Sequence, residues 1–481
     1  MPTPVTRYPH PLIDRYASAA MAEVFSPLRQ ARTWRDLWIA LAEIQRDLGV
    51  AIPAEAIEAM RAARDRIDLE RVAEIEAELR HDVMAHVHHF GEVAPEARPW
   101  LHLAATSAFV TDNAGLVQIR DGLRIVRGRL GAAMRALSEF ADRWKALPCV
   151  GYTHWQPAQP VTVGKRAALW LQDLVTDLEQ VETLLEGLQF RGARGTTGTE
   201  ASFLDLFDGD TEKVDELNAR LAARFEFAGT WDVVGQTYPR KFDHRVLSVL
   251  AGIGASVGRF GQDVRLLQSF GEIEEPFGQR QIGSSAMPYK RNPMRCERAC
   301  SLARHLCTRE IDAAWTASVQ GFERTLDDSA IRRIALPEAF FAADAVLLIV
   351  ADVAGGLVVH EPVIRARLAR ALPFLVTEKI LLAGVERGGD RQDLHERIRV
   401  HAMAARARLD EGAEDNDFFE RVAGDSAFGL GHDELAALSR PEDLTGRAAE
   451  QVERFLRLRV RPVLGALAGH DDGDETIALR V

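Results

Sequence analysis

The sequence predicts an all-α protein, and three observations support that prediction. Apolar residues recur every three or four positions from Ser107 to Leu147, and the same spacing returns in two later segments. Each of these segments is far longer than the roughly 11 to 12 residues of a mean globular helix. No segment of any length alternates apolar and polar residues as a half-buried strand does. We therefore expect a bundle of long helices with seams of coiled-coil spacing.

The length, composition and charge of the chain exclude several classes of protein. Its 481 residues exceed one ordinary compact domain, and 47% hydrophobic with 27% charged residues is typical of soluble globular proteins. A formal net charge of -12 argues against a nucleic-acid-binding protein, whose surface is basic. The first residues carry prolines and charges where a signal peptide is apolar, and the most apolar segment, 339–359, contains Asp344 and Asp352. We expect a buried helix there, and neither a membrane nor a nucleic acid as partner.

The cysteines indicate a reducing compartment and no metal ion. The chain has 4 cysteines, too few for a disulfide-stabilised scaffold of this length, which favours the cytoplasm. Cys296 and Cys300 stand one helical turn apart, a spacing that two zinc ligands can have. No Cys-x-x-Cys pair and no nearby His-x-x-x-His completes a ligand set. We therefore expect no bound metal.

Residues 1–106 are predicted to form an N-terminal domain of shorter helices. Their most reactive segment is "RHDVMAHVHHF", which contains His81, His86, His88 and His89. The metalloprotease motif HExxH is absent. The pattern leaves three interpretations open: a solvated helix face, a ligand-binding segment and, least favoured, a metal site.

Residues 107–359 are predicted to form a central domain of long helices. We expect Pro148 to end the first of them, because proline cannot continue a helix. The apolar sets of the next two span Leu171–Leu188 and Val246–Leu267. The third helix also contains glycines, each of which costs a helix interior roughly 1 kcal/mol. Either close packing between subunits or simple tolerance would explain them, at Gly252, Gly254, Gly258 and Gly261.

The segment "GYTHWQPAQPVTVGKR" places His154 among turn residues. We expect a long helix to begin at Pro160, so that His154 lies beside a helix N-terminus, where the dipole favours a neutral imidazole. Taken alone, a histidine in such a place is more often structural than catalytic.

The segment 281–298, "QIGSSAMPYKRNPMRCER", concentrates positive charge in an acidic chain. Gly-Ser-Ser is most often a linker, but here Lys290 and three arginines follow it at once, and a helix is expected after Pro293. Backbone N–H groups at that helix start, together with Lys290, would favour negative charge on a nearby oxygen. A serine in this loop is thereby predicted to act as a base.

Residues 360–481 are predicted to form a smaller helical C-terminal domain, because the apolar period shortens and charges become denser after His360. The acidic end of the chain, 469–481, is expected to be a mobile tail.

Five motifs in one order now indicate a family. "GSSAMPYKRNP" resembles the signature of the fumarase/aspartase superfamily, lyases that release fumarate by breaking a C–N or C–O bond. "RHDVMAHVH", "THWQPAQPVTVGKR", "RGTTGTEASF" and "FERTLDDSAIRR" are similar to segments of adenylosuccinate lyases, in the subgroup that includes the animal enzyme. The likeness covers nearly the whole chain.

The resemblance implies an architecture and an activity. It implies three helical domains and a homotetramer whose core is the long central helices, with each active site assembled from three subunits. It also implies two reactions of purine synthesis: adenylosuccinate to AMP plus fumarate, and the succinyl-carboxamide ribotide SAICAR to AICAR plus fumarate. Neither a metal nor an organic cofactor is expected.

The resemblance also assigns residues. Ser284 is expected to be the base and Lys290 to stabilise the carbanion-like state, with His154 as the general acid and His81 as a second histidine that contacts substrate. Because arginine donates two parallel bonds to phosphate or carboxylate, many of the expected substrate ligands are arginines. The expected substrate-binding residues are Arg15, Tyr16, Arg80, Asp82, Thr106, Ser107, Thr153, Gln236, Arg298, Arg324, Ser329 and Arg333.

One departure and two alternatives complete the prediction. Glu200 stands where the animal sequences carry Gln, and its charge either perturbs a substrate carboxylate or lies outside the site. A sister lyase, such as argininosuccinate lyase, would share the serine loop but would not need Arg15, Tyr16 or the "FERTLDDS" segment for a nucleotide. A structural protein recruited from this superfamily is the other alternative, and the presence of both His154 and Ser284 argues against it.

Overall fold

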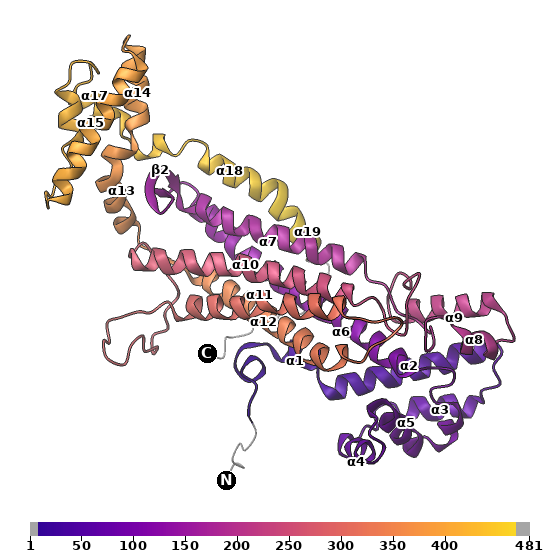
Figure 1. Cartoon of the computed structure of the whole chain (residues 1–481). Helices are drawn as coiled ribbons and strands as arrows, with labels where there is room; N and C mark the ends of the chain where they lie inside the picture. Colours follow the sequence, from indigo (N-terminus) through magenta and orange to yellow (C-terminus); the bar gives the residue numbers. More distant parts are fainter. Residues whose placement is uncertain (1–7, 468–481) are drawn as a thin grey trace.

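The computed structural model describes residues 8–467 and is helical almost throughout, which confirms the all-α prediction (Figure 1). The expected tail, 469–481, lies outside the described residues. The N-terminal elements are η1 Leu12–Tyr16, α1 Ala19–Val24, α2 Pro27–Asp47, α3 Ala54–Ala62, α4 Leu69–Leu79, α5 Asp82–Val93 and η2 Pro95–Trp100.

The central part of the chain is a bundle of long helices, several of which run along one another through the middle of Figure 1. The first begins at the predicted residue, Ser107. The bundle helices are α6 Ser107–Arg143, α7 Val163–Glu186, α10 Lys241–Ser269, α11 Met294–Ser318 and α12 Asp328–Gly356. The shorter α8 Ala201–Leu206 and α9 Thr211–Arg224 lie beside α2, and the strands Ile273–Glu274 (β3) and Val358–Val359 (β4) pair antiparallel.

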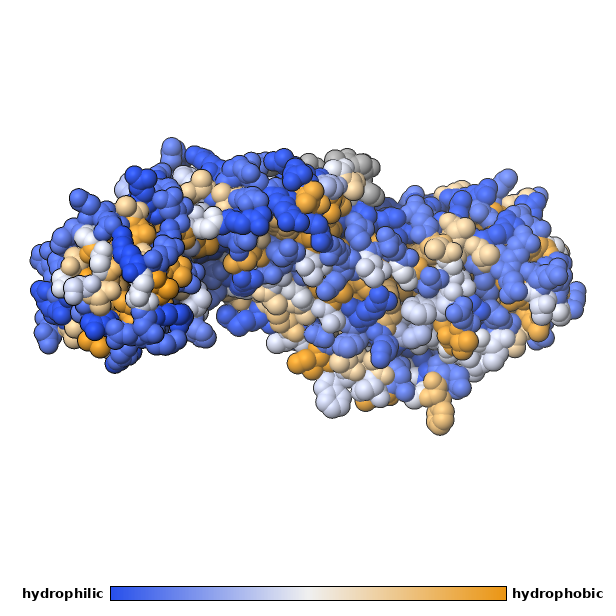
Figure 2. Space-filling model, turned by 90° about the horizontal axis from the view of Figure 1, so that it is seen from above, coloured by the Kyte–Doolittle hydropathy of each residue, from blue (hydrophilic) through white to orange (hydrophobic). Residues whose placement is uncertain are grey.

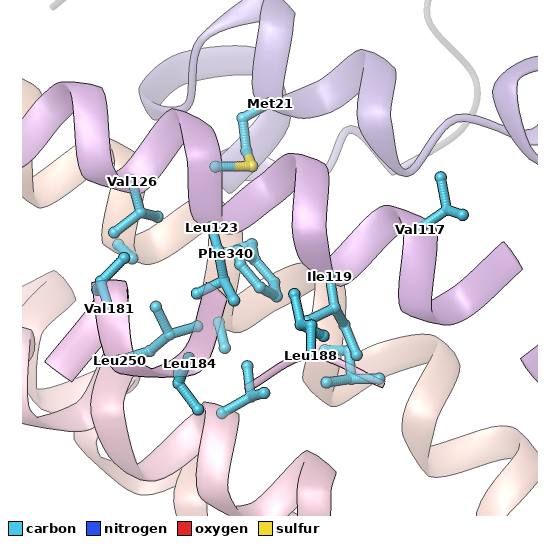
Figure 3. Close-up of a cluster of buried hydrophobic side chains, with 14 of the residues drawn as sticks. Met21, Val117, Ile119, Leu123, Val126, Val181, Leu184, Leu188, Leu250 and Phe340 are labelled. Atoms are coloured by element: carbon cyan, nitrogen blue, oxygen red, sulfur yellow. The ribbon is translucent and has the colours of Figure 1, made fainter. Parts of the chain in front are cut away.

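Apolar faces of four bundle helices and α1 meet in the core shown in Figure 3. The predicted spacing provides these side chains, because residues three and four apart share one helix face. A large ring enters where a glycine leaves room: a Cβ on Gly122 would lie 2.8 Å from the ring of Phe340. The labelled side chains are Met21, Val117, Ile119, Leu123, Val126, Val181, Leu184, Leu188, Leu250 and Phe340.

Two of the four glycines of α10, Gly254 and Gly261, are explained by close packing within one chain, whereas Gly252 and Gly258 have no contact within residues 8–467 that requires glycine. A Cβ on Gly254 would lie 3.0 Å from Cys307 Sγ of α11, and one on Gly261 would lie 2.8 Å from Cys300 Sγ. Both thiols in turn point at carbonyl oxygens of α10, at distances of 3.7 Å for Cys300 and 3.4 Å for Cys307. Glycine and cysteine therefore let α10 and α11 approach closely, and these thiols act as packing groups.

A β-hairpin between α6 and α7 overturns the helix start predicted at Pro160. The helix α6 ends at Arg143, β1 spans Pro148–Thr153, and β2 spans Gln156–Thr162 and contains Pro160. Prolines in both strands exclude a helix here, since each lacks a backbone N–H. The hydroxyl of Thr162 then accepts the N–H of Lys165 and caps α7, which begins at Val163.

The C-terminal helices divide into two groups. The first group has its own core, which includes Ile380, Leu394 and Phe418, and it stands apart at the upper left of Figure 1. It consists of α13 Glu361–Leu375, α14 Thr377–Glu386, α15 Arg391–Asp410, α16 Phe418–Ala423, α17 His432–Leu438 and η3 Pro441–Leu444. The second group returns along α7 and α6: α18 Ala448–Phe455, η4 Leu456–Val460 and α19 Arg461–Leu467. Domain boundaries at 106 and 359 stay a prediction.

The most apolar segment is a core helix, as predicted. Within residues 8–467, α12 is the one helix long and apolar enough to cross a bilayer, and 78% of its most apolar window is buried inside the structure. Its Asp344 is 3.0 Å from Nε of Arg129 and accepts the N–H of Ser18 at 2.6 Å, so the buried charge is paired. The face shown in Figure 2 is mainly hydrophilic, with scattered apolar patches and no continuous apolar band.

Candidate active site

His81 lies at the junction of α5 and α6. Its Nδ1 accepts the N–H of Met84 at 3.3 Å and so caps α5, while its Nε2 is 3.5 Å from Oγ of Ser107. Because Nδ1 is an acceptor, a neutral His81 carries its hydrogen on Nε2, the atom that faces Ser107. Arg80 precedes it in the left-handed region with φ of 52°, and Thr106 is the N-cap residue of α6. The structure thus gathers four of the predicted residues.

A second contact joins this group to α12. Nη2 of Arg333 is 2.6 Å from Oδ2 of Asp82, and the Arg333 side chain is 66% exposed. The two predicted ligands therefore pair with each other in this state. A substrate that uses either side chain has to compete with this ion pair.

Two other histidines of this segment, His86 and His89, are packing residues. His86 stacks edge-on against Trp34, and Nε2 of His89 accepts the N–H of Asp68 at 3.0 Å. Burial lowers the pKa of His86 to about 4 and lowers the pKa of His89 as well. His88 is exposed. Among the predicted histidines of this segment, only His81 faces another candidate residue.

Gln236 and Arg324 are held at one end of the bundle. The Gln236 N–H donates to the carbonyl of Glu323 at 2.9 Å, and its side-chain amide donates to the carbonyl of Thr196 at 3.1 Å. Sequence reasoning missed Arg191, a fully buried side chain whose Nε donates to the carbonyl of Gln236 at 2.8 Å. No sequence pattern distinguishes that arginine from the exposed ones.

Beneath these residues lies a buried ion network. Asp328 is 2.9 Å from Arg324 and 2.6 Å from Arg240, and Arg240 is 2.8 Å from Asp112 of α6. The side chains of Arg240, Asp112 and Asp328 are at most 2% exposed. Nearby arginines, Arg240 first, hold the pKa of Asp112 below its usual value against the effect of burial. Ser329 is the next residue of α12, and its N–H donates to the carbonyl of Leu326 at 3.0 Å.

Tyr16 brings η1 to the start of α11. The guanidinium carbon of Arg298 is 5.6 Å from the centroid of the Tyr16 ring, and that of Arg15 is 6.0 Å away. Both distances are within the range of cation–π attraction. The structure therefore brings these three predicted ligands together, with Arg15 exposed.

His154 is at the tip of the hairpin, away from any helix start. Thr153 pairs with Gln156, so His154 and Trp155 form a two-residue turn with φ values of 52° and 61°. Positive φ at both positions is the backbone of a type I′ turn, which strongly prefers Asn and Gly. Non-glycine residues there cost energy of order 1 kcal/mol each. The dipole argument for His154 is wrong, because α7 begins only at Val163.

Ser284 and Lys290 stand on an exposed loop between β3 and α11. Oγ of Ser284 accepts the N–H of Met287 at 3.1 Å, and the side chain of Asn292 donates to the carbonyl of Gly283 at 2.7 Å. The helix predicted after Pro293 is present as α11. Its first N–H groups do not point at Ser284, however, because those of Arg295 and Cys296 donate to the carboxylate of Glu275, each at 3.0 Å. That part of the sequence prediction is wrong.

Within one chain, the candidate catalytic residues therefore lie in separate places. In Figure 1 the hairpin strand β2 lies beside the C-terminal helices at one end of the bundle, and α5 lies at the other end. The side chain of His154 makes no hydrogen bond or ion pair within residues 8–467, and no contact in that range joins His81, His154 and Ser284.

Glu200 is paired inside the protein. Its Oε1 accepts a hydrogen bond from Arg194 at 2.8 Å and one from Asn218 at 2.9 Å. Arg194 also donates to the hydroxyl of Thr230 and to the carbonyl of Trp231. The extra charge is therefore neutralised by Arg194 and closes the loop 195–199.

Comparisons with known proteins identify the family. A family model described as "Lyase" matches residues 29–308, and one described as "Adenylosuccinate lyase C-terminus" matches 373–455. The adenylosuccinate lyase of Saccharomyces cerevisiae is 48% identical over 477 residues, covering 98% of this chain and 99% of its own. That of Schistosoma mansoni is 48% identical over 459 residues, covering 95% and 96%.

Solved structures share the fold. The crystal structure of a fumarate lyase from Mesorhizobium sp. BNC1 superposes with a TM-score of 0.80 at 25% identity, covering 95% of this chain and 99% of that one. This superposition shows that the similarity found by the family models holds for the fold of nearly the whole chain. Identity of 48% over nearly the full length then decides among the lyases of this fold: the chain belongs to the adenylosuccinate lyase family.

Proposed function

We propose that this protein eliminates fumarate from adenylosuccinate to give AMP and from SAICAR to give AICAR. The observation that carries the proposal is Ser284, a half-buried serine on a basic, exposed loop, whose oxygen accepts a backbone N–H, in a chain of this family. The reaction breaks the C–N bond between the purine-side nitrogen and the succinyl group. A proton leaves the succinyl carbon next to a carboxylate, and another is delivered to the departing nitrogen.

Proton removal is the difficult step. The hydrogen is α to a carboxylate, so its loss produces a dianion that only nearby positive charge can stabilise. Ser284 takes that proton, and the N–H of Met287 favours negative charge on its oxygen before the transfer. Lys290, exposed on the same loop, supplies positive charge to the intermediate.

His154 protonates the departing nitrogen. It stands on a turn of two positive-φ residues, and strain of this kind gathers at functional sites. His81 contacts the substrate from the junction of α5 and α6, with Nε2–H as donor. Arginines on three elements, Arg298, Arg324 and Arg333, bind phosphate or carboxylate, together with the other ligands predicted above.

We propose that the protein is a homotetramer whose active sites are shared between subunits. Two observations support this. The reacting groups of one chain do not meet, and α11 and α12 with the turn between them expose large apolar side chains. These include Trp315 at 69%, Phe322 at 104% and Leu326 at 73% exposure. Apolar groups exposed in this way mark surfaces that a partner covers. The long helices of neighbouring subunits would cover them and bring Ser284 to a foreign His154.

Fumarate release tests the activity directly. Purified protein should convert both adenylosuccinate and SAICAR, followed by absorbance, while argininosuccinate should remain unchanged. Addition of a metal chelator should leave the rate as it was, because no metal or organic cofactor takes part in the proposed reaction. If neither purine substrate releases fumarate, the proposed function is wrong.

We place the enzyme in the cytoplasm, where its unpaired cysteines remain reduced.

Mixing two inactive variants tests the shared site. Protein with His154→Gln and protein with Ser284→Ala should each be inactive as homotetramers. After mild dissociation and reassembly of equal amounts, roughly a quarter of the sites should contain neither lesion, by independent choice of two subunits. Activity should then return to about that fraction. Verified mixed tetramers without any recovery would exclude a site that combines these two residues from different chains.

A further inference from the structure

The loop that carries Ser284 is fastened at its base by two side chains to which the family motifs assign no role. The loop leaves the bundle after β3 and returns at α11, so its two ends lie close together. Gln268, in the last turn of α10, contacts both ends. Its Oε1 accepts the N–H of Glu275 at 3.1 Å, and its Nε2 donates to the carbonyl of Arg291 at 2.9 Å.

Glu275 makes the second connection between the two ends. It belongs to the outgoing end of the loop and is 2% exposed. Its two carboxylate oxygens accept the N–H groups of Arg295 and Cys296 in the first turn of α11, each at 3.0 Å. A buried carboxylate is stable in this place because two N–H donors and the positive end of the helix dipole face it. The Glu275 carboxylate thus joins the outgoing end of the loop to the first turn of α11.

Within residues 8–467, the other contacts at the loop base hold one end only or involve an exposed side chain. Pro276 packs against Gly356, where an added Cβ would lie 2.7 Å from its ring, and this fixes only the outgoing end. Arg291 joins the two ends as well, at 3.3 Å from Glu274 and 5.4 Å over the ring of Phe277, but its side chain is 57% exposed and such contacts contribute little. The side chain of Asn292 ties the returning end to Gly283 within the loop. Gln268 therefore ties both ends of the loop to α10, and the buried Glu275 ties the outgoing end to the first turn of α11.

We propose that Glu275 and Gln268 are positioning residues for catalysis: together they fix the base of the loop and thereby the place of Ser284 and Lys290 relative to α11. The proposal rests on the function proposed above. Reacting groups need a defined separation, and displacement by about 1 Å can cost a factor of about 10² in rate. The proposed ligands of the rest of the substrate lie on other elements. Loss of Glu275 or Gln268, a pair called the clasp below, should therefore reduce kcat more than it affects KM.

Steady-state kinetics and limited proteolysis test this proposal. In the intact enzyme, Glu275→Gln places an amide donor against a backbone N–H, and Gln268→Leu removes both bonds of the glutamine at similar size. Each change should lower kcat by about 10- to 100-fold with KM within about threefold of wild type. The double variant should lose little more than either single variant, because the two side chains act as one unit. Gln262→Leu, an exposed position on the same helix, is the matched control and should leave both constants unchanged.

Proteolysis provides a readout that does not depend on turnover. Trypsin can cut the exposed loop after Arg280, Lys290 or Arg291, and a loosened base should raise the rate of cleavage there by about tenfold. If both variants keep kcat within about twofold of wild type and are cut at the wild-type rate, the clasp has no positioning role. If Glu275→Gln does not fold, the half-buried Gln268 decides the question alone. An inactive wild-type enzyme would contradict the proposed function, and the cleavage rates would still test the clasp.

Discussion

Two regions of the candidate active site are held in opposite ways: the residues around Gln236 and Arg324, and the loop that carries Ser284. Gln236 and Arg324 rest on a network in which Asp112, Arg240 and Asp328 are at most 2% exposed and each charge faces an opposite one. Ser284 stands on an exposed loop and makes its side-chain bond only to the neighbouring N–H of Met287. The first region is rigid because moving any one charge would leave another unpaired in the interior.

This difference indicates a division of work. Side chains proposed to bind the substrate are preorganised by their own chain, whereas the proposed base and acid stand on exposed elements that other groups must complete. Binding energy gathered at the rigid region can then be used to close the exposed loop over the reacting bond. Replacing a residue of the exposed loop should therefore reduce turnover, whereas replacing a residue of the buried network should reduce stability.

The largest effect is expected in the exposed region. Ser284→Ala should lower kcat by about 10² or more, because the base is lost. Folding should be intact, since the loop contributes little packing, and KM should change far less than kcat. Circular dichroism and thermal melting check the fold, and stopped assays check turnover. A near-normal kcat would move the base elsewhere, with Ser285 or a histidine as the next candidate.

The buried network should respond in the opposite way. Asp328→Asn removes the charge between Arg240 and Arg324, and leaving buried cations without their partner should cost about 3 kcal/mol or more of unfolding free energy. Asp327→Asn, one residue earlier and exposed, is the control and should cost well under 1 kcal/mol. Urea unfolding measures both. Equal stability of the two variants would show that the network is not what holds this region.

Some of this contrast could be predicted from sequence, and some could not. The 3–4 spacing of apolar residues predicted the long helices, and the motif around Ser284 predicted an exposed loop before a helix. The hairpin was missed because its proline-rich strands, Pro148–Thr153 and Gln156–Thr162, are too short to show an alternation. Glu275 and Arg191 were missed because their partners are backbone N–H and carbonyl groups, which no pattern of side chains encodes.

Asp177 is a buried carboxylate that, unlike Asp112 and Asp328, forms no ion pair within residues 8–467. Asp177 of α7 is 5% exposed, and burial raises its pKa to about 7, with Ser256 as a hydrogen-bond partner and Asp173 as a nearby like charge. The folded state then binds more protons than the unfolded state from about pH 4 to about pH 7, so stability falls as pH rises through that window.

Asp177→Asn should remove this dependence. The variant should be more stable than wild type at pH 8, by of order 1 to 3 kcal/mol, because a neutral amide needs no counter-charge. Near pH 4 the two proteins should differ little, since Asp177 is then protonated and resembles the amide in shape. Thermal melting across pH 4 to 8 measures the difference. Parallel melting curves for the two proteins over this range would contradict a raised pKa at Asp177.

The smallest effect is expected at Glu200, where a paired charge closes a loop beside Gln236. Glu200→Gln keeps an oxygen that can accept from Arg194 and Asn218 and removes only the charge, so unfolding free energy should fall by about 1 kcal/mol. Arg194→Leu, which removes the cation and its bonds to Thr230 and Trp231, should cost more. The order of the two losses, measured by urea unfolding, tests whether the loop depends mainly on Arg194.

The value of kcat/KM for Glu200→Gln should stay within about threefold of wild type, because Glu200 faces Arg194 and Asn218 rather than a free space for substrate. A loss of about tenfold or more with unchanged stability would instead place the Glu200 charge at a substrate group.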